Sequence, residues 1–343
     1  MDPPLPSSPP GEATSRLAPR EYRQARLPTY FTLNLMDSLL AELHTLRDWL
    51  RWGTSRFNEA GLVFGHGTDN AYDEAAYLIL HALHLPPHRL DPFLDARLTH
   101  SERVAVLNLL QQRVARRVPA AYLTQEAWLG DFRFYVDERV IVPRSYFAEL
   151  LAEGFSPWVE DAETIEDALD LCTGSGCLAI LMAHAFPNAT VDGADISPPA
   201  LEVARRNVDA YGLAEQVRLV ESDVFSGLQG RRYDLIISNP PYVTSASMAA
   251  LPPEYRQEPV LALAAGDDGL DVVRRILQDA RQHLKPGGLL AVEVGFNRDL
   301  VEAAFPDLPL TWLDTPSSEE KIFLIHGNDL PSSSPHKRST RLA

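Results

Sequence analysis

Residues 168–176, Ala168-Leu169-Asp170-Leu171-Cys172-Thr173-Gly174-Ser175-Gly176, join a short apolar run to a turn with two glycines. The run predicts a buried strand, and the apolar residues after the turn predict a helix that begins near Ser175. Gly174 and Gly176 allow the backbone to turn tightly and to approach a ligand closely. Glycines serve plain structural turns equally well, so the turn alone is a weak functional signal.

Strands and helices alternate from this turn toward the C-terminus. Further apolar runs at residues 190–194, 217–220, 235–238 and 289–294 predict strands, and helices are expected from Pro198 and Gly269. This alternation predicts an α/β fold with a mostly parallel sheet and helices on both faces. Because ligands of such sheets bind beyond the carboxyl ends of the strands, functional residues are expected there.

The N-terminal part of the chain has a helical pattern instead. One face of a predicted helix carries Leu39, Leu43, Leu46 and Leu50. Residues 70–85 predict a second helix. A third is expected to begin at Thr99, which forms a possible capping box with Glu102. This region predicts a compact helical domain without evident chemistry.

Residues 121–143 change from a helical to a strand pattern. Ala127-Trp128-Leu129 and residues 132–136 flank Gly130-Asp131, which predicts a β-hairpin. Both chain ends are rich in Pro and Ser and cannot bury enough apolar surface to offset their ordering entropy. The predicted organisation is a disordered tail (1–29), a helical domain (30–120), a hairpin linker (121–143), the α/β domain (144–328) and a second disordered tail (329–343).

Composition excludes several classes of protein. The 343 residues are 45% hydrophobic and 23% charged, without a run of eighteen apolar residues that could span a membrane. Cys172 and Cys177 are too few for a disulfide scaffold and lack the nearby histidines of a zinc site. Both are expected to be small buried residues, and no metal is expected. The net charge of −16 disfavours naked nucleic acid and favours a basic partner. A cytoplasmic location is the expectation.

Acidic residues follow the next two predicted strands. Asp195 is placed to accept hydrogen bonds from two ribose hydroxyls, and Asp223 could accept one from an adenine amino group beside Val224. Each aspartate could equally cap a helix or lie in a solvated turn. Aspartates at successive strand ends favour an adenosine ligand. The glycine turn also fits G-x-G-x-x-A, the fingerprint of nicotinamide cofactors, so these residues leave the cofactor open.

The segment Asn239-Pro240-Pro241-Tyr242 directly follows the apolar strand 235–238. Its two prolines lack N–H donors and fix the chain as it leaves the sheet. The side-chain oxygen of Asn239 and the carbonyl of Pro240 can then point the same way, and two convergent acceptors fit a planar NH₂ group. Tyr242 offers an aromatic face to hold that group. A rigid loop would explain the prolines but not the whole tetrapeptide.

Asp170–Gly176, Asp195 and Asn239–Tyr242 together resemble the motifs of S-adenosylmethionine-dependent methyltransferases that modify planar nitrogens. Adenine-N6 nucleic-acid methyltransferases and the glutamine-N5 protein methyltransferases of the HemK/Prm family share the tetrapeptide. The chain is similar to the second group over almost its whole ordered length. The resemblance implies a Rossmann-like methyltransferase domain with a mostly parallel seven-stranded sheet, and S-adenosyl-L-methionine as the cofactor.

The resemblance also implies which residues act. The catalytic residues are then Asn239, Pro240, Pro241 and Tyr242. The residues that bind the cofactor are then Asp170, Cys172, Thr173, Gly174, Ser175, Gly176, Asp195, Asp223, Val224 and Asn239.

Other motifs resemble the ribosomal-protein branch of this family, the PrmB type. They are Phe57–Gly61, Gly65–Asn70, Val142–Ser145 and Glu254–Pro259. The release-factor branch carries Pro-Arg-Pro-Glu-Thr-Glu after the hairpin, from which Ser145-Tyr146-Phe147 departs, and often has Trp where Val224 stands. The branch resemblance implies methylation of a glutamine side-chain nitrogen (N5) in large-subunit ribosomal protein L three, a basic protein.

Alternative functions are glutamine-N5 methylation of peptide release factors, adenine-N6 methylation of nucleic acid, NAD-dependent oxidation and non-catalytic binding in ribosome assembly. The acidic charge disfavours nucleic acid as the substrate. An oxidoreductase leaves the tetrapeptide unexplained, and the intact motifs disfavour a non-catalytic binder.

Several polar residues outside these motifs have two possible roles. Residues 30–120 carry no cofactor motif and are expected to recognise the protein substrate. Glu254, Arg256 and Glu258 either contact that substrate or form loop salt bridges. Arg144 is a candidate for the mouth of the active site, and His66 for a structural or substrate-contacting loop.

Overall fold

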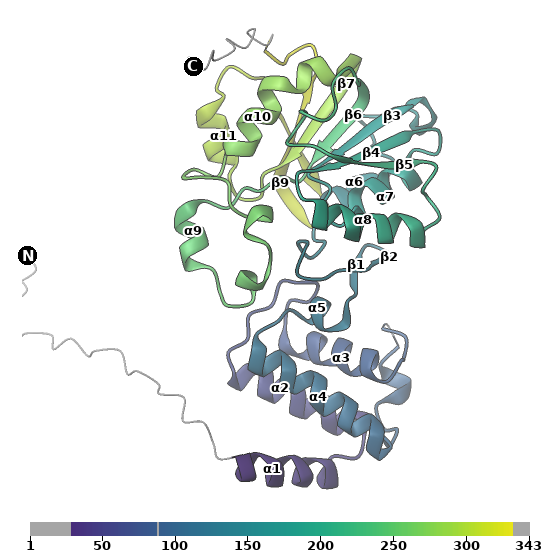
Figure 1. The fold of residues 1–343 in the computed structure, drawn as a ribbon, viewed down its shortest axis with the longest axis vertical. Helices are drawn as coiled ribbons and strands as arrows, with labels where there is room; N and C mark the ends of the chain where they lie inside the picture. Colours follow the sequence, from purple (N-terminus) through teal and green to yellow (C-terminus); the bar gives the residue numbers. More distant parts are fainter. Residues whose placement is uncertain (1–28, 88, 332–343) are drawn as a thin grey trace, which may run out of the picture. The chain divides into compact units, whose positions relative to one another are not determined.

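A computed structural model describes residues 29–87 and 89–331 (Figure 1). The two predicted disordered tails fall almost entirely outside these ranges. The chain divides into two units, residues 1–43 and 44–343. Helix α1 (Thr29–Glu42) belongs to the first unit, and every other described element belongs to the second. No described helix is long and apolar enough to cross a lipid bilayer.

The leucines at positions 39, 43, 46 and 50 do not share one helix, contrary to the prediction. Helix α1 ends at Glu42, and α2 (Leu46–Glu59) begins after Thr45. Thr45 Oγ1 accepts a hydrogen bond from the Asp48 amide at 3.2 Å, and Asp48 Oδ2 accepts one from the Thr45 amide at 2.8 Å. This capping box starts a new helix where the leucine spacing alone predicts a continuous one.

A helical region opens the second unit. After α2 it contains α3 (Ala71–Ala82), η1 (Asp91–Phe93), α4 (His100–Arg116) and α5 (Ala120–Thr124). The capping box predicted for α4 is confirmed, because the Thr99 amide donates to Glu102 Oε2 at 2.7 Å. Helices α2, α3 and α4 pack through buried apolar faces that include Trp49, Ile79 and Leu110.

The predicted hairpin is confirmed. Strands β1 (Ala127–Leu129) and β2 (Phe132–Phe134) pair antiparallel. Asn207 joins the segment after the hairpin to the glycine turn. Its Oδ1 accepts from the Tyr135 amide at 2.8 Å, and its Nδ2 donates to the Ser175 carbonyl at 2.9 Å.

A seven-stranded sheet forms the centre of the second unit. Its strands are β3 (Asp167–Leu171), β4 (Thr190–Asp195), β5 (Val217–Glu221), β6 (Tyr233–Ser238), β7 (Leu284–Glu293), β8 (Thr311–Thr315) and β9 (Ser318–His326). They lie in the order β5-β4-β3-β6-β7-β9-β8. The five strands from β3 to β7 are parallel, as predicted. Strand β9 is antiparallel to both its neighbours. The family resemblance implies seven strands, but the residue pattern did not locate β8 and β9.

Helices cover both faces of the sheet (Figure 1). Ala168 belongs to the apolar cluster that includes α6 (Phe147–Ala152), α7 (Cys177–Ala185) and α8 (Pro198–Ala210), whereas Leu169 belongs to the cluster that includes α10 (Asp271–Asp279) and α11 (Arg298–Ala304). Successive strand residues thus point to opposite faces. The remaining short helices are η2 (Ala162–Thr164), α9 (Ser245–Ala250), η3 (Tyr255–Gln257), η4 (Val260–Ala262) and η5 (Ala280–His283).

The packed part of the chain extends beyond the predicted boundary at residue 328. Leu330 is buried in the apolar cluster beside α10, and its carbonyl accepts a hydrogen bond from Arg281. The apolar side chain therefore keeps the start of the predicted tail against the core.

The order of the strands reverses beside β3. Strands β4 and β5 lie on one side of it, and β6 and β7 lie on the other. Leu171 at the end of β3 pairs with Ser238 at the end of β6, and Ser238 Oγ donates to the Leu171 carbonyl at 2.7 Å. Open α/β sheets bind ligands at such a reversal.

Candidate active site

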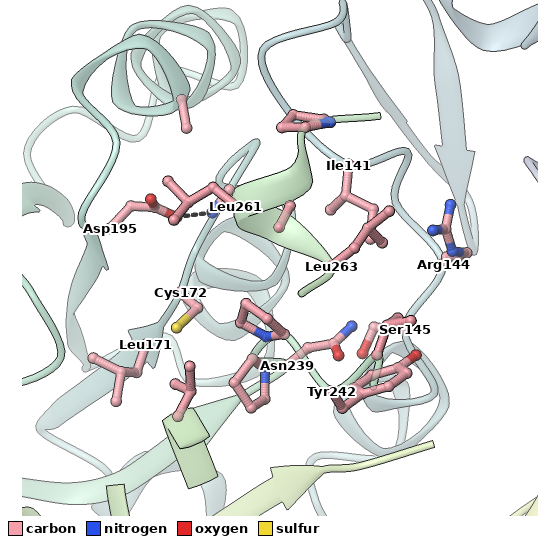
Figure 2. Close-up of a pocket in the computed structure, with 18 of the residues that line it drawn as sticks. Ile141, Arg144, Ser145, Leu171, Cys172, Asp195, Asn239, Tyr242, Leu261 and Leu263 are labelled. Atoms are coloured by element: carbon pink, nitrogen blue, oxygen red, sulfur yellow. Dashed lines mark hydrogen bonds between the residues drawn. The ribbon is translucent and has the colours of Figure 1, made fainter. Parts of the chain in front are cut away.

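A cavity of about 960 Å³, the main cavity, opens at the carboxyl ends of β3, β4 and β6 (Figure 2). The predicted site residues that line it are Cys172, Gly174, Asp195, Asp223, Val224, Asn239, Pro240, Pro241 and Tyr242. The structure thus brings the three sequence motifs to one place. Four other predicted cofactor residues do not line it, namely Asp170, Thr173, Ser175 and Gly176.

Asp170 supports the glycine turn from behind. Its Oδ2 accepts hydrogen bonds from Thr173 Oγ1 at 2.5 Å and from the Ala179 amide at 2.9 Å. Burial raises the pKa of Asp170 to about 7. Gly176 has φ +78°, and a Cβ on it would lie 3.0 Å from the Cβ of Ala204. Asp170 and Gly176 therefore fix the shape of the turn rather than contacting the cavity.

Asp195 at the end of β4 faces the main cavity (Figure 2). Its Oδ2 accepts from the Gly174 amide at 2.9 Å, and its Oδ1 accepts from the Ser197 amide at 2.9 Å. Burial raises the pKa of Asp195, and these backbone hydrogen bonds oppose that effect. A carboxylate oxygen has more than one acceptor position. Asp195 can therefore accept hydrogen bonds from two ligand hydroxyls while it holds the turn.

Two residues in the loops after β3 and β5 adopt left-handed backbone conformations beside the cavity. Cys172 has φ +66°, and Val224 has φ +53°. Such conformations are costly for residues with a Cβ and concentrate at functional sites. The carboxylate of Asp223, next to Val224, lies 2.8 Å from Nη2 of Arg275, which also lines the cavity. Sequence reasoning did not anticipate Arg275, because no local pattern singles it out.

The two cysteines are free, and they differ in exposure. Cys177 is buried as predicted, whereas Cys172 is only half-buried because it lines the cavity. Burial raises the pKa of the Cys177 thiol to about 12 and that of Cys172 also above its ordinary value. Both thiols are therefore protonated at neutral pH, and neither is an activated nucleophile. No cluster of three or more potential metal ligands occurs among the described residues.

The Asn-Pro-Pro-Tyr segment forms one end of the cavity. Figure 2 shows Asn239, Ser145 and Tyr242 close together, with Asp195 on the other side of the cavity. The Tyr242 carbonyl accepts from Asn297 Nδ2 at 2.7 Å. A Cβ on Gly295 would lie 2.9 Å from the Tyr242 ring, so the ring packs directly on this glycine. These contacts fix the tetrapeptide before any ligand binds.

The chain returns to the cavity after a long excursion, residues 244–262, here called the closing segment. Its two ends meet where the Val243 amide donates to the Leu263 carbonyl at 2.8 Å and the Ala265 amide donates to the Val243 carbonyl at 3.0 Å. Tyr255 and Leu261 in this segment line the cavity. The closing segment therefore forms a wall of the main cavity.

Two glutamates of the closing segment are buried in ion pairs. Glu258 accepts from Arg144 Nη1 at 2.6 Å and Nη2 at 2.7 Å, and from the Val142 amide at 3.0 Å. Glu254 Oε1 accepts from Arg117 Nη1 at 3.0 Å and from the Val63 amide at 3.2 Å. Neither glutamate side chain is exposed, so both form structural salt bridges rather than substrate contacts.

The other three candidates outside the motifs have separate positions. Arg144 lines the main cavity, as expected for a residue at its mouth. His66 is buried, with Nε2 3.4 Å from Glu258 Oε2. Arg256 is exposed and donates to the Ala249 carbonyl within the closing segment. The buried pairs of Glu254 and Glu258 thus join this segment to the helical region.

Glu293 is a buried residue behind the cavity wall that the sequence analysis missed, and it holds Ser145 and Tyr146, which line the cavity. It ends β7, and its Oε2 accepts from Ser145 Oγ at 2.6 Å and from the Tyr146 amide at 3.1 Å. Its Oε1 has no hydrogen-bond partner among the described residues. Burial raises the pKa of Glu293 to about 7. Its place at the end of a predicted strand was the available signal.

Comparisons with known proteins agree with this architecture. Residues 149–251 match the family model "Methyltransferase small domain", and residues 48–124 match "PrmC N-terminal domain".

Curated relatives extend the similarity to most of the chain. The chain is 58% identical over 291 residues to the ribosomal protein uL3 glutamine methyltransferase of Neisseria meningitidis serogroup A, covering 85% of this chain and 96% of the relative. The enzymes of the same name from Bordetella pertussis and Burkholderia pseudomallei are 59% and 56% identical, over 83% and 84% of this chain and 95% and 96% of those relatives.

The α/β domain is a Rossmann-like methyltransferase domain of the S-adenosylmethionine-dependent type. The high identity over nearly the full length of the relatives decides the family. The chain belongs to the ribosomal protein uL3 glutamine methyltransferases.

Proposed function

We propose that the chain transfers a methyl group from S-adenosylmethionine to the side-chain amide nitrogen (N5) of a glutamine in ribosomal protein uL3. The observation that carries this proposal is the meeting of Asn239 and Pro240 with Asp195 in one cavity. The relatives named for activity on uL3 supply the substrate. A ribosomal-protein substrate implies a cytoplasmic enzyme.

The residues at the strand ends suit this methyl donor. Asp195 has acceptor positions for the two ribose hydroxyls, and the Gly174 turn leaves room for the ligand beside it. Val224 and Asp223 both line the cavity. Val224 would supply an apolar surface for the adenine ring, and Asp223 would accept a hydrogen bond from its amino group. A volume of about 960 Å³ accommodates both the donor and a glutamine side chain.

When bound, S-adenosylmethionine supplies a methyl group attached to a positively charged sulfur. The chain's own task is to make a glutamine amide nitrogen attack that group. Asn239 Oδ1 and the Pro240 carbonyl accept the two amide hydrogens, and Tyr242 holds the planar amide by its ring face. Positive charge develops on the nitrogen during the attack. Acceptors fixed beforehand stabilise this charge where it forms.

Positioning supplies much of the remaining catalysis. The prolines and the contacts of Tyr242 with Asn297 and Gly295 hold the acceptors in place. No strong base is required before the transfer, because an amide nitrogen that has gained a methyl group loses its proton readily.

Mass spectrometry of uL3 tests the proposal directly. Purified enzyme, S-adenosylmethionine and uL3 are incubated together, and the modified residue is located by fragmentation. One methyl group on a glutamine nitrogen is expected. Unmodified uL3 together with a methylated release factor or methylated adenine would overturn the proposed substrate.

A further inference from the structure

A second cavity, of about 370 Å³, lies between the helical region and the hairpin. Its walls include the aromatic side chains of Tyr72, Tyr77 and Trp128. Three carboxylates line it, those of Asp73, Asp91 and Glu126, whereas none of its described lining residues is Lys or Arg. Carboxylates and aromatic faces together are the surroundings that a Lys or Arg side chain prefers.

The imidazole of His66 is an independent sign that this cavity takes a ligand. His66 lines the cavity, and its side chain is only 1% exposed. Its Nε2 lies 3.4 Å from Glu258 Oε2, whereas its Nδ1 has no hydrogen-bond partner among the described residues. A buried polar group without a partner is costly. A neutral imidazole offers one acceptor nitrogen, which a cationic donor in the cavity can satisfy.

The carboxylates retain acceptor positions for such a donor. Asp73 Oδ2 accepts from Asn70 Nδ2 at 2.7 Å, and Glu126 Oε1 accepts from Trp128 Nε1 at 3.0 Å. Glu126 Oε2 also pairs at 3.3 Å with Arg133, whose side chain is largely exposed and does not line the cavity. These single contacts leave further lone pairs on the carboxylates.

The second cavity is adjacent to the main cavity along the chain. Gly65 lines the main cavity, and the next residue, His66, lines the second. The rings of His66 and Tyr255 are 4.2 Å apart between centroids, and Tyr255 lines the main cavity. The two cavities therefore share a stretch of wall, and one extended segment of a bound protein would have to cross only this stretch to reach both.

We propose that the second cavity binds a Lys or Arg side chain of the protein substrate, in the same segment as the methylated glutamine. The inference rests on the proposed function for the identity of the substrate and adds a site for its recognition. The net charge of −16 favours the same kind of partner, because it attracts a basic protein before the specific contacts form.

The double variant Asp91→Asn/Glu126→Gln tests this site. It removes two charges with little change in shape, and the amide oxygen that replaces the Glu126 carboxylate can still accept from Trp128. Asp95→Asn is the matched control, because Asp95 lies four residues after Asp91, pairs with exposed Arg47 and does not line the cavity. Binding of fluorescently labelled uL3 is measured by anisotropy, without cofactor and at low salt.

We expect the double variant to bind uL3 about tenfold more weakly, as for the loss of two partly exposed charge contacts. Asp95→Asn should stay within about twofold of the parent enzyme. Added salt should weaken the binding of uL3 to the parent enzyme more than its binding to the double variant. At saturating uL3 the turnover of the double variant should be unchanged, because the cavity lies outside the catalytic residues.

Equal affinity of the parent enzyme and the double variant would overturn the inference. That result leaves the proposed function intact if uL3 is still methylated. Conversely, uL3 that binds through this cavity but gains no methyl group would overturn the proposed function alone.

Discussion

Arg144 and Glu258 form a bidentate ion pair in which Nη1 lies 2.6 Å from Oε1 and Nη2 lies 2.7 Å from Oε2. Glu258 belongs to the closing segment, and Arg144 lines the main cavity. The pair therefore fixes one wall of the active site relative to its mouth. A planar guanidinium matches a carboxylate in this geometry, which Lys could not reproduce.

Acid should destabilise the protein through Glu258. Burial opposes its ionisation, but the neighbouring His66 and Arg144 outweigh burial and lower the pKa of Glu258 to about 2. Because the folded pKa is below the unfolded value of 4.5, this stabilisation is complete above about pH 4.5 and is lost as the pH falls toward 2. It amounts to roughly 3 kcal/mol.

Glu258→Gln should reduce the free energy of unfolding at pH 7 by about 3–5 kcal/mol, because it leaves Arg144 without its counter-charge. Urea unfolding of the parent enzyme and the variant at pH 7 and pH 3 provides the measurement. The difference in unfolding free energy between the parent enzyme and the variant should be smaller at pH 3 than at pH 7. Arg256→Gln is the control and should change little, because Arg256 is exposed. A variant as stable as the parent enzyme at pH 7 would contradict this account.

Glu293 should have the opposite pH dependence. Burial raises the pKa of Glu293 to about 7, above the unfolded value of 4.5. The folded state then binds the proton more tightly, so the contribution of Glu293 to stability falls as the pH rises from about 4.5 to 7. In Glu293→Gln the amide oxygen can still accept from Ser145 and Tyr146, but the titration is gone. We expect the difference in unfolding free energy between pH 5 and pH 8 to change by roughly 3 kcal/mol. An identical pH dependence in the variant would refute this role.

Binding of the methyl donor should depend on Asp195. Asp195→Ala removes two acceptors that face the cavity and should weaken the binding of S-adenosylmethionine by about 1–3 kcal/mol. Isothermal titration calorimetry measures this loss, and NAD should not bind to the parent enzyme. Asp195→Asn keeps one oxygen that can accept a hydrogen bond from a hydroxyl, and its affinity for S-adenosylmethionine should fall less than that of Asp195→Ala. Tight binding of NAD, or unchanged affinity in Asp195→Ala, would contradict the assignment.

Much of the fold could be predicted because its signals are local. The strand beginning near Ala168, the hairpin at Gly130-Asp131 and the cap at Thr99 are each specified by a few adjacent residues. The missed break at Thr45 is also local, but the leucine spacing masked it. The β8–β9 pair, which the residue pattern did not locate, carries charged residues in β9 before its apolar part, which weakens the alternation.

The residues of the candidate site also comprise some that could be predicted from the sequence and some that could not. The acceptors of the tetrapeptide and Asp195 could be found because each lies at the carboxyl end of an apolar strand. The pairs Arg144–Glu258 and Ser145–Glu293 could not, because their members are distant in sequence and meet only when the sheet and the closing segment are folded. His66 was a candidate from the sequence, but its place in the wall of the second cavity could not be predicted, because the other lining residues are distant in sequence.

Asn239 provides the most direct test of the methyl-transfer chemistry. Asn239→Ala removes an acceptor whose interaction strengthens as the amide nitrogen becomes positive. Loss of a comparable fixed polar group costs roughly a hundredfold to a thousandfold in turnover. Because the lost interaction acts in the transition state, the effect should persist at saturating cofactor and saturating uL3. Single-turnover methylation measures it.

Asn239→Asp separates the acceptor from the rest of the side chain. It keeps the shape and an acceptor oxygen, but it adds a negative charge beside the positively charged sulfur of the donor and removes the NH₂ donor. We expect cofactor binding to change more than in Asn239→Ala, because the added carboxylate attracts the positively charged sulfur. Turnover should remain low, because that attraction also stabilises the bound cofactor before the reaction begins. Near-normal turnover of Asn239→Ala in the single-turnover assay would show that the acceptor pair does not stabilise the transition state.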